Sequence, residues 1–517
     1  MHTHDRKYAA LLAAAFLTTV YVLYSKLTLY FSRRKFRRAH NCQPPASRYG
    51  SYWPLSEVHF LVNIIRHARA HTLLPFTDQL YSTLGPTFIT GLQRTGIFTN
   101  EPENIKAALA TKFDDYAVAP IRQQAVKHLL GEGIFTTDGR FWAHSRAMLR
   151  PNFAREQVAE LTQLEAHMRA FLALVPDDGA TVDLQDLFHR YSLDASTQFL
   201  FGASKNSLAP DQSGEQETFA ASFDYAMLDA MARNRFGRLY YMWPDKRAAA
   251  AVKYCRNTVQ EYVDRALAYR RAQDKSPERL EKAEKDSRKE EKGHYVFLHE
   301  LAKQISDPVR IRDETLSVLF AGRDTTAGLL SGLWYELARN ADVWRKLLAE
   351  VDELDGELPT YEVLRNMKFL KYCVSEALRL HPPVPILSKV AIRDTVLPLG
   401  GGPDGKAPLF VQKDSILVYS IYSMHRRKDI WGDDAADFRP ERWADPGLRP
   451  GWAFLPFGGG PRVCLGQQYA LTETYYVTIR IMQHFRKIEN RDHKPWMEKL
   501  SVTCCSWNGV QVGLSKA

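Results

Sequence analysis

One stretch constrains this chain more than any other: a glycine-rich loop with one cysteine, followed at once by an apolar segment. Residues 454–473 read FLPFGGGPRVCLGQQYALTE. The glycines at 458–460 carry no side chain and permit positive φ, so the backbone can lie against a flat ligand and aim amides at the Cys464 sulfur. Gly466 allows an equally close approach, and a helix after it would place its positive end beside the sulfur and favour the metal-binding thiolate. The stretch therefore predicts a thiolate metal ligand, with a tight turn around a buried cysteine as the alternative.

The full spacing around the cysteine is more restrictive than glycine plus cysteine. It reads Phe457-x-x-Gly460-x-Arg462-x-Cys464-x-Gly466 and resembles the haem-thiolate signature of the cytochrome P450 monooxygenases. The resemblance implies that Cys464 is the axial ligand of the iron of haem b, that Phe457 shields the sulfur and that Arg462 holds a haem propionate. Thiolate ligation pushes electron density onto iron and favours O–O cleavage, which fits such a role.

The length and composition of the chain are those of a globular protein. Its 517 residues can bury a large core, in one large domain or a few small ones. A formal charge of +10 points first to nucleic acid, but no zinc-knuckle, RNP-type or basic-zipper pattern is present. We therefore expect the positive charge to serve a membrane surface or an acidic protein partner.

The cysteines do not form a recognisable framework. There are six of them, and none has C-x-x-C spacing, which argues against a disulfide scaffold or a zinc site. Their scatter fits a reducing compartment in which one thiolate serves a metal. They are Cys42, Cys255, Cys373, Cys464, Cys504 and Cys505.

An apolar run lies near the start of the chain. Residues 8–31 read YAALLAAAFLTTVYVLYSKLTLYF and contain one charge, Lys26, so they reach the roughly 20 positions that a membrane-spanning helix needs. A cleaved signal peptide is the competing interpretation, but the run is longer than the usual h-region and lacks a small-x-small exit. The basic residues at 33–38 outweigh Arg6 and Lys7, so we expect an uncleaved, single-pass anchor with the bulk of the chain in the cytosol.

Only one linker is apparent in the sequence. Pro44 and Pro45 cannot continue a helix and predict a linker that lifts the rest of the chain off the membrane. We therefore expect an anchor and linker over residues 1–50 and one large catalytic domain over residues 51–517, without internal repeats.

The periodicity of this domain predicts a mainly α fold with small β-sheets. Strand signals lie at 86–99 and 391–419, the second punctuated by GGGPDG. The charged run at 270–292 predicts a solvated loop or helix end with no chemistry. The clearest helical patterns cover residues 101–110, 153–174, 248–271 and 313–339.

The last of these helices has an unusual centre. Residues 321–326 read AGRDTT, and polar residues with a glycine inside a buried helix are costly unless they act. Small residues let a planar cofactor or dioxygen approach the backbone, and a hydroxyl beside a carboxylate can relay protons. A kinked helix with a satisfied Asp–Thr pair is the alternative. The hexapeptide resembles the central-helix motif of the same family, which implies that Asp324 and Thr325 deliver protons during oxygen activation.

Two further patterns match the family. Glu376 and Arg379 share a helix face at i, i+3, which alone is a common surface pair worth tenths of a kcal/mol. The resemblance implies that they join Arg442, in PERW at 440–443, in a buried structural triad that locks the haem pocket.

The haem propionates have further partners by the same resemblance. Trp142 and Arg146 at i, i+4 match the other propionate-binding helix of the family. Lys389 stands where a second propionate contact would fall.

Within the family, four segments resemble the fungal group that hydroxylates n-alkanes and fatty acids at the chain end: AGRDTTAGLLS, GGGPDG, HRRKDI and CLGQQYALTE. The residues at 386–389, ILSK, depart from the Arg-Asn-x-Arg that is usual there. This strand lines the substrate cavity in the family, so a more apolar lining leaves the carboxylate of a fatty acid without its usual partners.

We therefore expect a membrane-anchored haem monooxygenase that oxidises an unactivated C–H bond of a long lipophilic substrate. A fatty acid, an alkane and an alkyl-bearing fungal secondary metabolite such as a polyketide remain open, as does whether oxidation stops at the alcohol. Non-catalytic haem binding and reductase-independent peroxide rearrangement are the rival functions. Intact Asp324 and Thr325 argue against a mere haem carrier.

The electron supply follows from what the sequence lacks. No flavin or nicotinamide domain follows Glu473, and no G-x-G-x-x-G follows a strand. We therefore expect electrons from NADPH–cytochrome P450 reductase at the endoplasmic reticulum, docked on a basic face near Cys464, with cytochrome b5 as a further donor.

Overall fold

The structure is a computed structural model, which describes residues 2–516 except 51–54, 92–94, 154–160, 210–214, 237–239, 241, 243–244 and 276–295. Most of the charged run expected at 270–292, and the start of the helix expected at 153–174, lie outside the described residues.

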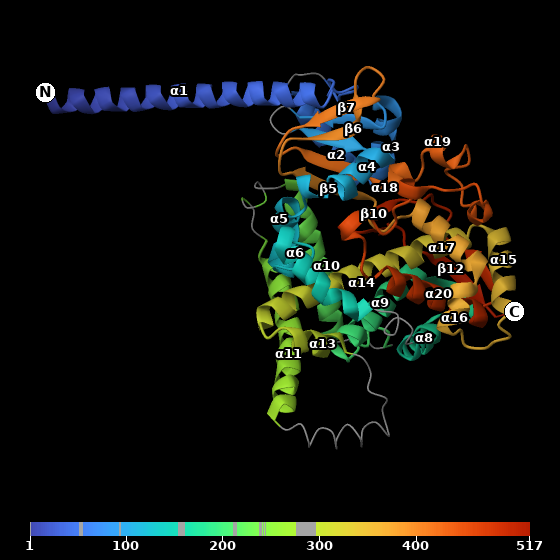
Figure 1. Ribbon diagram of the computed structural model, residues 1–517. Helices are drawn as coiled ribbons and strands as arrows, with labels where there is room; N and C mark the ends of the chain where they lie inside the picture. Colours follow the sequence, from blue (N-terminus) through green and yellow to red (C-terminus); the bar gives the residue numbers. More distant parts are fainter. Residues whose placement is uncertain are drawn as a thin grey trace.

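One long helix, α14 (Pro308–Leu337), runs through the middle of the molecule (Figure 1). Asp307 caps the start of this helix, because its carboxylate accepts hydrogen bonds from the amides of Val309 and Arg310. Pro308 occupies the first turn. Its C-terminal half, including Leu330 and Trp334, belongs to one hydrophobic core cluster. Its N-terminal half belongs to a second cluster, so α14 joins the two halves of the core.

The fold class is confirmed as mainly α with small sheets. The other helices in the first half of the domain are α2 (Leu55–Arg69), α3 (Leu73–Leu84), α4 (Pro102–Lys106), α5 (Ala119–Leu130), α6 (Gly139–Leu149), α8 (Thr162–Leu174), α9 (Leu184–Phe201), α10 (Glu215–Phe236) and α11 (Lys246–Lys275). Those in the second half are α13 (Phe297–Gln304), α15 (Ala341–Asp352), α16 (Tyr361–Asn366), α17 (Lys368–Leu380), α18 (Ile421–Met424), α19 (Lys428–Trp431) and α20 (Gln467–His484).

The largest sheet has the strand order β1-β2-β8-β5-β3, in which β2 and β8 are parallel and the other neighbours antiparallel. Its strands are β1 (Thr87–Thr90), β2 (Gly96–Thr99), β3 (Tyr116–Ala117), β5 (Ile386–Ala391) and β8 (Ile416–Ser420). The hairpin β6 (Thr395–Gly401) and β7 (Ala407–Val411) lies nearby (Figure 1). The smaller sheets are β4 (Asp178–Asp183) with β12 (Gln511–Ser515) and β9 (Lys487–Asn490), and β10 (Glu498–Leu500) with β11 (Cys504–Ser506).

Local deviations from the expected elements have physical reasons. The helix expected over 101–110 ends as α4 at Lys106 and continues as a π-helical turn, Ala107–Thr111. The second β region begins earlier than expected, at β5, because the strand starts directly after Pro385, whose fixed φ suits an extended chain. The helix expected after Gly466 is present as α20.

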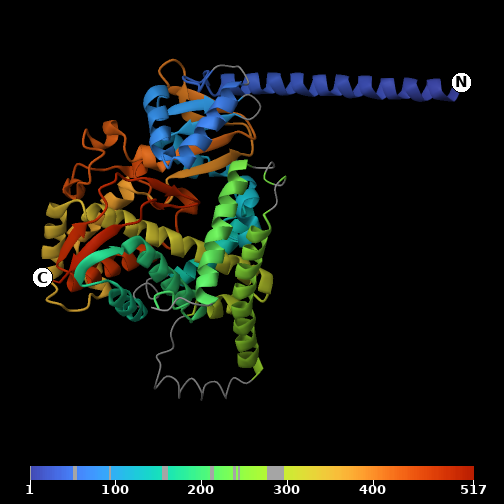
Figure 2. The same cartoon turned by 180° about the vertical axis from the view of Figure 1, so that it is seen from behind.

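The N-terminal helix α1 (His2–Ala39) leaves the body of the molecule as one rod (Figures 1 and 2). Its residues Leu11–Ala39 are long and apolar enough to cross a membrane, and none of that span's apolar window is buried in the protein. The helix therefore runs past the expected end at residue 31 and includes the basic residues at 33–38.

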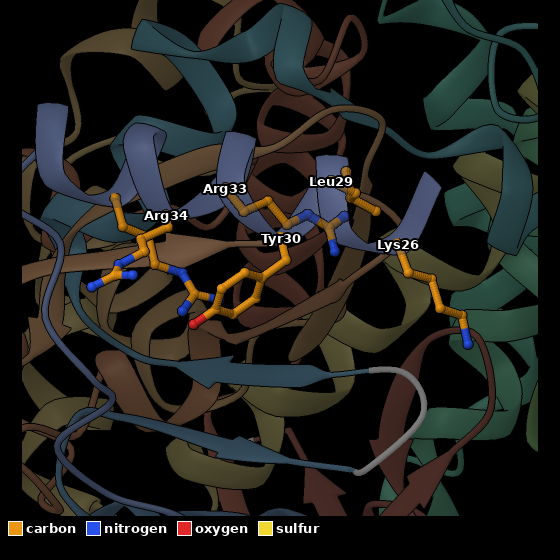
Figure 3. Close-up of a pocket in the computed structure, with 6 residues that line it drawn as sticks. Lys26, Leu29, Tyr30, Arg33 and Arg34 are labelled. Atoms are coloured by element: carbon orange, nitrogen blue, oxygen red, sulfur yellow. The ribbon is translucent and has the colours of Figure 1, made fainter. Parts of the chain in front are cut away.

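The base of α1 is attached to the domain. Arg33 donates to both carboxylate oxygens of Asp394, at 2.9 and 3.2 Å. The Arg37 guanidinium lies 4.6 Å above the Phe410 ring of β7. Figure 3 shows the same face of α1, where Lys26, Tyr30, Arg33 and Arg34 project around a shallow hollow.

The segment after α1 differs from a free linker. Gln43 pairs with Leu409 of β7, and Pro45 pairs with Gly401 of β6. The amides of Gln43 and Ala46 donate 2.9 Å hydrogen bonds to carbonyl oxygens of the β6–β7 hairpin. Residues 43–49 thus add to the sheets, because prolines lose a donor but leave the neighbouring amides free to pair.

Candidate functional site

The cysteine loop is held in shape by its own backbone. The amide of Cys464 donates a 3.0 Å hydrogen bond to the carbonyl oxygen of Phe457. Gly458 and Gly460 have φ of 72° and 66°, in the left-handed region that favours glycine. A Cβ on Gly460 would also lie 2.0 Å from the carbonyl oxygen of Leu109, so the loop can approach the π-helical turn only with a glycine.

Two other loop glycines differ in what surrounds them. Gly459 is extended, with φ of −157°, and a Cβ there would lie 2.7 Å from a ring carbon of Trp452. Close packing against the indole therefore accounts for this glycine. A Cβ on Gly466 would meet only the Phe153 ring, at 3.7 Å, which is ordinary contact. Packing within the described chain does not explain Gly466, and close approach of a ligand stays the prediction for it.

The Cys464 side chain is exposed, but the protein around it still perturbs the pKa of its thiol. The residue is exposed, yet desolvation by the surrounding protein raises its pKa, against a backbone hydrogen bond from Gly466 and the charge of Arg146, which lower it. Both facts hold together if the side chain opens onto a recess walled by protein rather than onto the outer surface. α20 begins at Gln467, so the positive end of its dipole lies beside this sulfur and favours a thiolate.

Next to the loop lies a buried ammonium group. Lys389 of β5 is 2 % exposed; its Nζ atom donates a 3.1 Å hydrogen bond to the carbonyl oxygen of Ala108 and lies 4.9 Å from the Phe113 ring centre. Desolvation, together with the charges of Arg462 and Arg122, lowers its pKa to about 7. Within the described part of the chain no carboxylate forms an ion pair with it.

Arg462 shares this positive region. It donates to the Thr137 carbonyl oxygen at 2.8 Å and to Asp138 Oδ1 at 2.5 Å, and its guanidinium lies 4.4 Å above the Trp142 ring. Desolvation lowers its pKa to about 10, against the attraction of Asp138. Arg146, four residues along α6 from Trp142, donates a 2.8 Å hydrogen bond to the Val463 carbonyl oxygen within the cysteine loop.

The charges of this region do not balance. Three cations, Lys389, Arg462 and Arg122, influence one another, and Asp138 is the carboxylate that offsets them. Buried positive charge without enough counter-charge is costly unless an anion joins it. Haem b brings two propionate carboxylates and an iron that a cysteine thiolate can bind, so the donor set of Cys464, Arg462 and Lys389 fits this group.

Glu376, Arg379 and Arg442 come together as expected. Arg379 donates to both carboxylate oxygens of Glu376, at 2.9 and 2.8 Å, and Arg442 Nε donates to Oε1 at 2.7 Å. The Trp443 indole N–H donates to the other oxygen at 3.0 Å. None of the three charged side chains is more than 4 % exposed. Arg379 also bonds carbonyl oxygens of residues 425, 435 and 437, so the cluster fastens α17 to the chain that leads into the cysteine loop.

The centre of α14 does not hold the Asp–Thr pair that was the alternative to a proton relay. The Thr325 hydroxyl donates a 2.6 Å hydrogen bond to the Ala321 carbonyl oxygen. Asp324 instead lies 3.3 Å from Nη1 of Arg323. A Cβ on Gly322 would come within 3.0 Å of Ser196 Oγ, so this glycine lets α9 approach α14. Asp324 and Thr325 therefore have different partners and are not hydrogen-bonded to each other in the described structure.

Sequence reasoning missed three groups near these elements. Arg122 and Asp138 join the cation cluster, and the only local signal is that Asp138 directly precedes α6. Glu473, at the end of the cysteine stretch, is 2 % exposed, and desolvation raises its pKa to about 8 against a hydrogen bond with Thr326. Its Oε1 atom has no hydrogen-bond partner among the residues that the structure describes.

Comparisons with known proteins point to one family. The family model described as Cytochrome P450 matches residues 54–505. The chain is 46% identical to the cytochrome P450 monooxygenase fsdH of Fusarium heterosporum, over 98% of this chain and 89% of that protein. It is 45% identical to the cytochrome P450 monooxygenase himC of Aspergillus japonicus, over 98% and 90% of the two chains. It is 40% identical to cytochrome P450 52A13 of Debaryomyces hansenii, over 97% and 98%.

Proposed function

Because this chain belongs to the cytochrome P450 family, we propose that it inserts one oxygen atom of O2 into an unactivated C–H bond of a long lipophilic substrate at a membrane. Such enzymes are haem-thiolate monooxygenases whose cofactor is haem b. The observation that carries the proposal is the exposed thiol of Cys464, two residues from Arg462 in a cluster of three cations that share one carboxylate.

We assign Cys464 as the iron ligand and Arg462 and Lys389 as propionate partners. Trp142 and Arg146 are assigned to the other propionate-binding helix, α6. Phe457 shields the sulfur. When bound, haem supplies the redox chemistry that oxidises the C–H bond. The chain supplies orientation: the Glu376 triad and the Cys464–Phe457 hydrogen bond hold the loop rigid, so the sulfur is placed without reorganisation.

Protons come from α14 in this proposal. Monooxygenation places one oxygen atom in the product and reduces the other to water, which consumes two electrons and two protons. Asp324 takes up a proton at its carboxylate. Thr325, the next residue, offers a hydroxyl that donates to the Ala321 carbonyl oxygen one helical turn earlier. These residues are the catalytic groups that we assign to the chain itself.

We place the enzyme in the endoplasmic reticulum membrane with its domain in the cytosol. The apolar span of α1 and the basic residues that follow it support this orientation. NADPH–cytochrome P450 reductase, with cytochrome b5 as a further donor, supplies the electrons. We keep residues 1–50 as the anchor region and 51–517 as the catalytic domain, although residues 43–49 are already bonded to the sheets.

A long alkyl chain is the substrate element that the site supports. Ile386, Leu387 and Ser388 of β5 are half-buried and bring no charge, whereas Lys389 is turned into the cation cluster. A fatty acid, an alkane and an alkyl-bearing fungal metabolite share this chain.

Turnover with labelled dioxygen tests the proposal. Microsomes that contain the full-length protein and reductase receive NADPH, 18O2 and a series of fatty acids and alkanes, and product masses are followed. We expect one 18O atom in a product formed near the chain end, dependent on NADPH and absent from Cys464→Ala microsomes. Product that forms equally without reductase from added lipid peroxides would favour peroxide rearrangement instead.

A further inference from the structure

One arginine joins the proton-delivery segment of α14 to a second helix. Arg323 directly precedes Asp324 and is 4 % exposed. Its Nη1 atom contacts Asp324 Oδ1 at 3.3 Å and contacts Oδ1 of Asp224, on α10, more closely. Its guanidinium also lies 5.6 Å from the ring centre of Phe223. α10 itself packs mainly against α5 and α11.

All three groups of this cluster are able to carry charge. Desolvation lowers the pKa of Arg323, but Asp324 and Asp224 outweigh it and raise the pKa above its ordinary value. The Asp224 side chain is 59 % exposed. Desolvation of its inner part raises its pKa, but the charge and hydrogen bond of Arg323 outweigh this and lower the pKa below its ordinary value. One cation therefore faces two carboxylates, and Arg323 Nε has no hydrogen-bond partner in the part of the chain that is described.

The two carboxylates compete for one guanidinium. A guanidinium that has only one carboxylate neighbour prefers a bidentate pair, which binds both of its oxygens. With Asp224 present, Arg323 approaches Asp324 through a single nitrogen at 3.3 Å, and the second Asp324 oxygen stays out of the pair. Without Asp224, Arg323 has Asp324 as its remaining partner and can close on both oxygens.

We propose that Asp224 is a positioning residue for proton delivery, which draws Arg323 toward α10 and keeps Asp324 out of a closed ion pair. The inference rests on the proposed monooxygenase function. Because Asp224 belongs to α10 and Asp324 to α14, Arg323 links the two helices at this point. The Asp324 oxygen outside the Arg323 pair then takes a proton from water and releases it toward Thr325.

The test compares product formed per NADPH in four forms of the full-length protein: wild type, Asp224→Asn, Arg323→Gln and the double variant. Misplacing a proton-transfer group costs about tenfold or more, so we expect Asp224→Asn to lower coupling about tenfold and release hydrogen peroxide instead. The double variant should recover most of the coupling, because the competing cation is gone. A larger solvent isotope effect on product formation in Asp224→Asn is the second expected result.

A matched control lies beside the same helix, at the residue that directly precedes α11. Asp245 accepts a 2.8 Å hydrogen bond from the Tyr225 hydroxyl of α10 without contacting Arg323, so Asp245→Asn should leave coupling unchanged. The reduced carbon monoxide spectrum should be the same in all forms, which excludes loss of the haem site as the cause.

Two results would overturn the inference alone: normal coupling in Asp224→Asn, or a double variant no better than Asp224→Asn, which would indicate a packing role. A wild-type enzyme that forms no oxygenated product at all would overturn the proposed function together with it.

Discussion

The Nζ atom of Lys389 donates a 3.1 Å hydrogen bond to the carbonyl oxygen of Ala108 and is buried beside Arg462 without a carboxylate in ion-pair contact among the described residues. An ammonium group in this position is unfavourable in the haem-free protein and favourable once an anion joins it. The same side chain should therefore have opposite effects on the haem-free and haem-loaded forms.

Lys389→Met should make the haem-free protein more stable near neutral pH. The folded-state pKa of about 7 is lower than that of an unfolded lysine, so burial of the charged form destabilises the fold fully below about pH 7. That penalty disappears as pH rises toward about 10, the ordinary lysine value. The gain in free energy of unfolding, measured by urea unfolding of both forms, should shrink over this range. A gain that grows with pH would contradict the assigned burial.

The haem-loaded form should respond in the opposite direction. Lys389→Met should lose haem faster to a haem-scavenging protein, because one propionate partner is gone. Lys413→Met is the matched control on the exposed turn before β8, and it should retain haem as the wild type does. Equal rates of haem loss from Lys389→Met and wild type would show that Lys389 is not a propionate partner.

Glu376→Ala should strongly destabilise the domain. It leaves Arg379 and Arg442 buried without their shared carboxylate, and breaking such a pair costs about 3–5 kcal/mol. The exposed pair of Lys346 and Glu441 provides the control, since Glu441→Ala should cost only about 0–1 kcal/mol. Denaturant unfolding of both variants, with the yield of haem-loaded protein, measures the difference. Equal costs would show that the triad contributes no more than a surface pair.

Thr325→Ala should uncouple NADPH use from product formation. The hydroxyl that we assign to proton handling is lost, whereas the helix keeps its backbone, so coupling should fall by about tenfold or more. Ser331→Ala removes the same kind of hydrogen bond, from Ser331 Oγ to the Ala327 carbonyl oxygen at 2.6 Å, farther along α14. That control should retain coupling. Unchanged coupling in Thr325→Ala would favour the reductase-independent peroxide route.

Truncation should distinguish the anchor from the domain. A variant that begins at residue 41 keeps the backbone hydrogen bonds of residues 43–49, whereas one that begins at residue 51 loses them. At about 0.5–1.5 kcal/mol for each bond, the shorter form should be less stable by a few kcal/mol. Thermal unfolding of the two haem-loaded forms gives the comparison, and equal midpoints would show that this segment is a free linker. The bonds lost join residues 43, 44, 46, 47 and 49 to residues 408, 402, 400 and 89.

Local motifs made much of this site predictable. The spacing of Phe457, Arg462 and Cys464, and the i, i+3 pair of Glu376 and Arg379, are short-range features that a sequence displays directly. α14 and α20 were also predictable, because the apolar pattern placed the first at 313–339 and Gly466 precedes the second. The earlier start of α14, at Pro308 after the Asp307 cap, was not predicted.

Other features depend on segments far apart in the chain. The cation cluster draws on α5, β5 and the cysteine loop, so the imbalance around Asp138 exists only after folding. Gly322 packs against Ser196 of α9, which periodicity cannot reveal. The Arg323 contact with Asp224 spans 99 positions, and the sequence indicated only that Arg323 was an expensive residue in a buried helix.

The reduced carbon monoxide difference spectrum tests the central claim most directly. Full-length protein in membranes is reduced, exposed to carbon monoxide and compared with Cys464→Ala prepared in the same way. We expect the long-wavelength band of thiolate-ligated haem in the wild type and its complete loss in the variant. A wild type without that band, or a variant that keeps it, would contradict Cys464 as the haem-iron ligand.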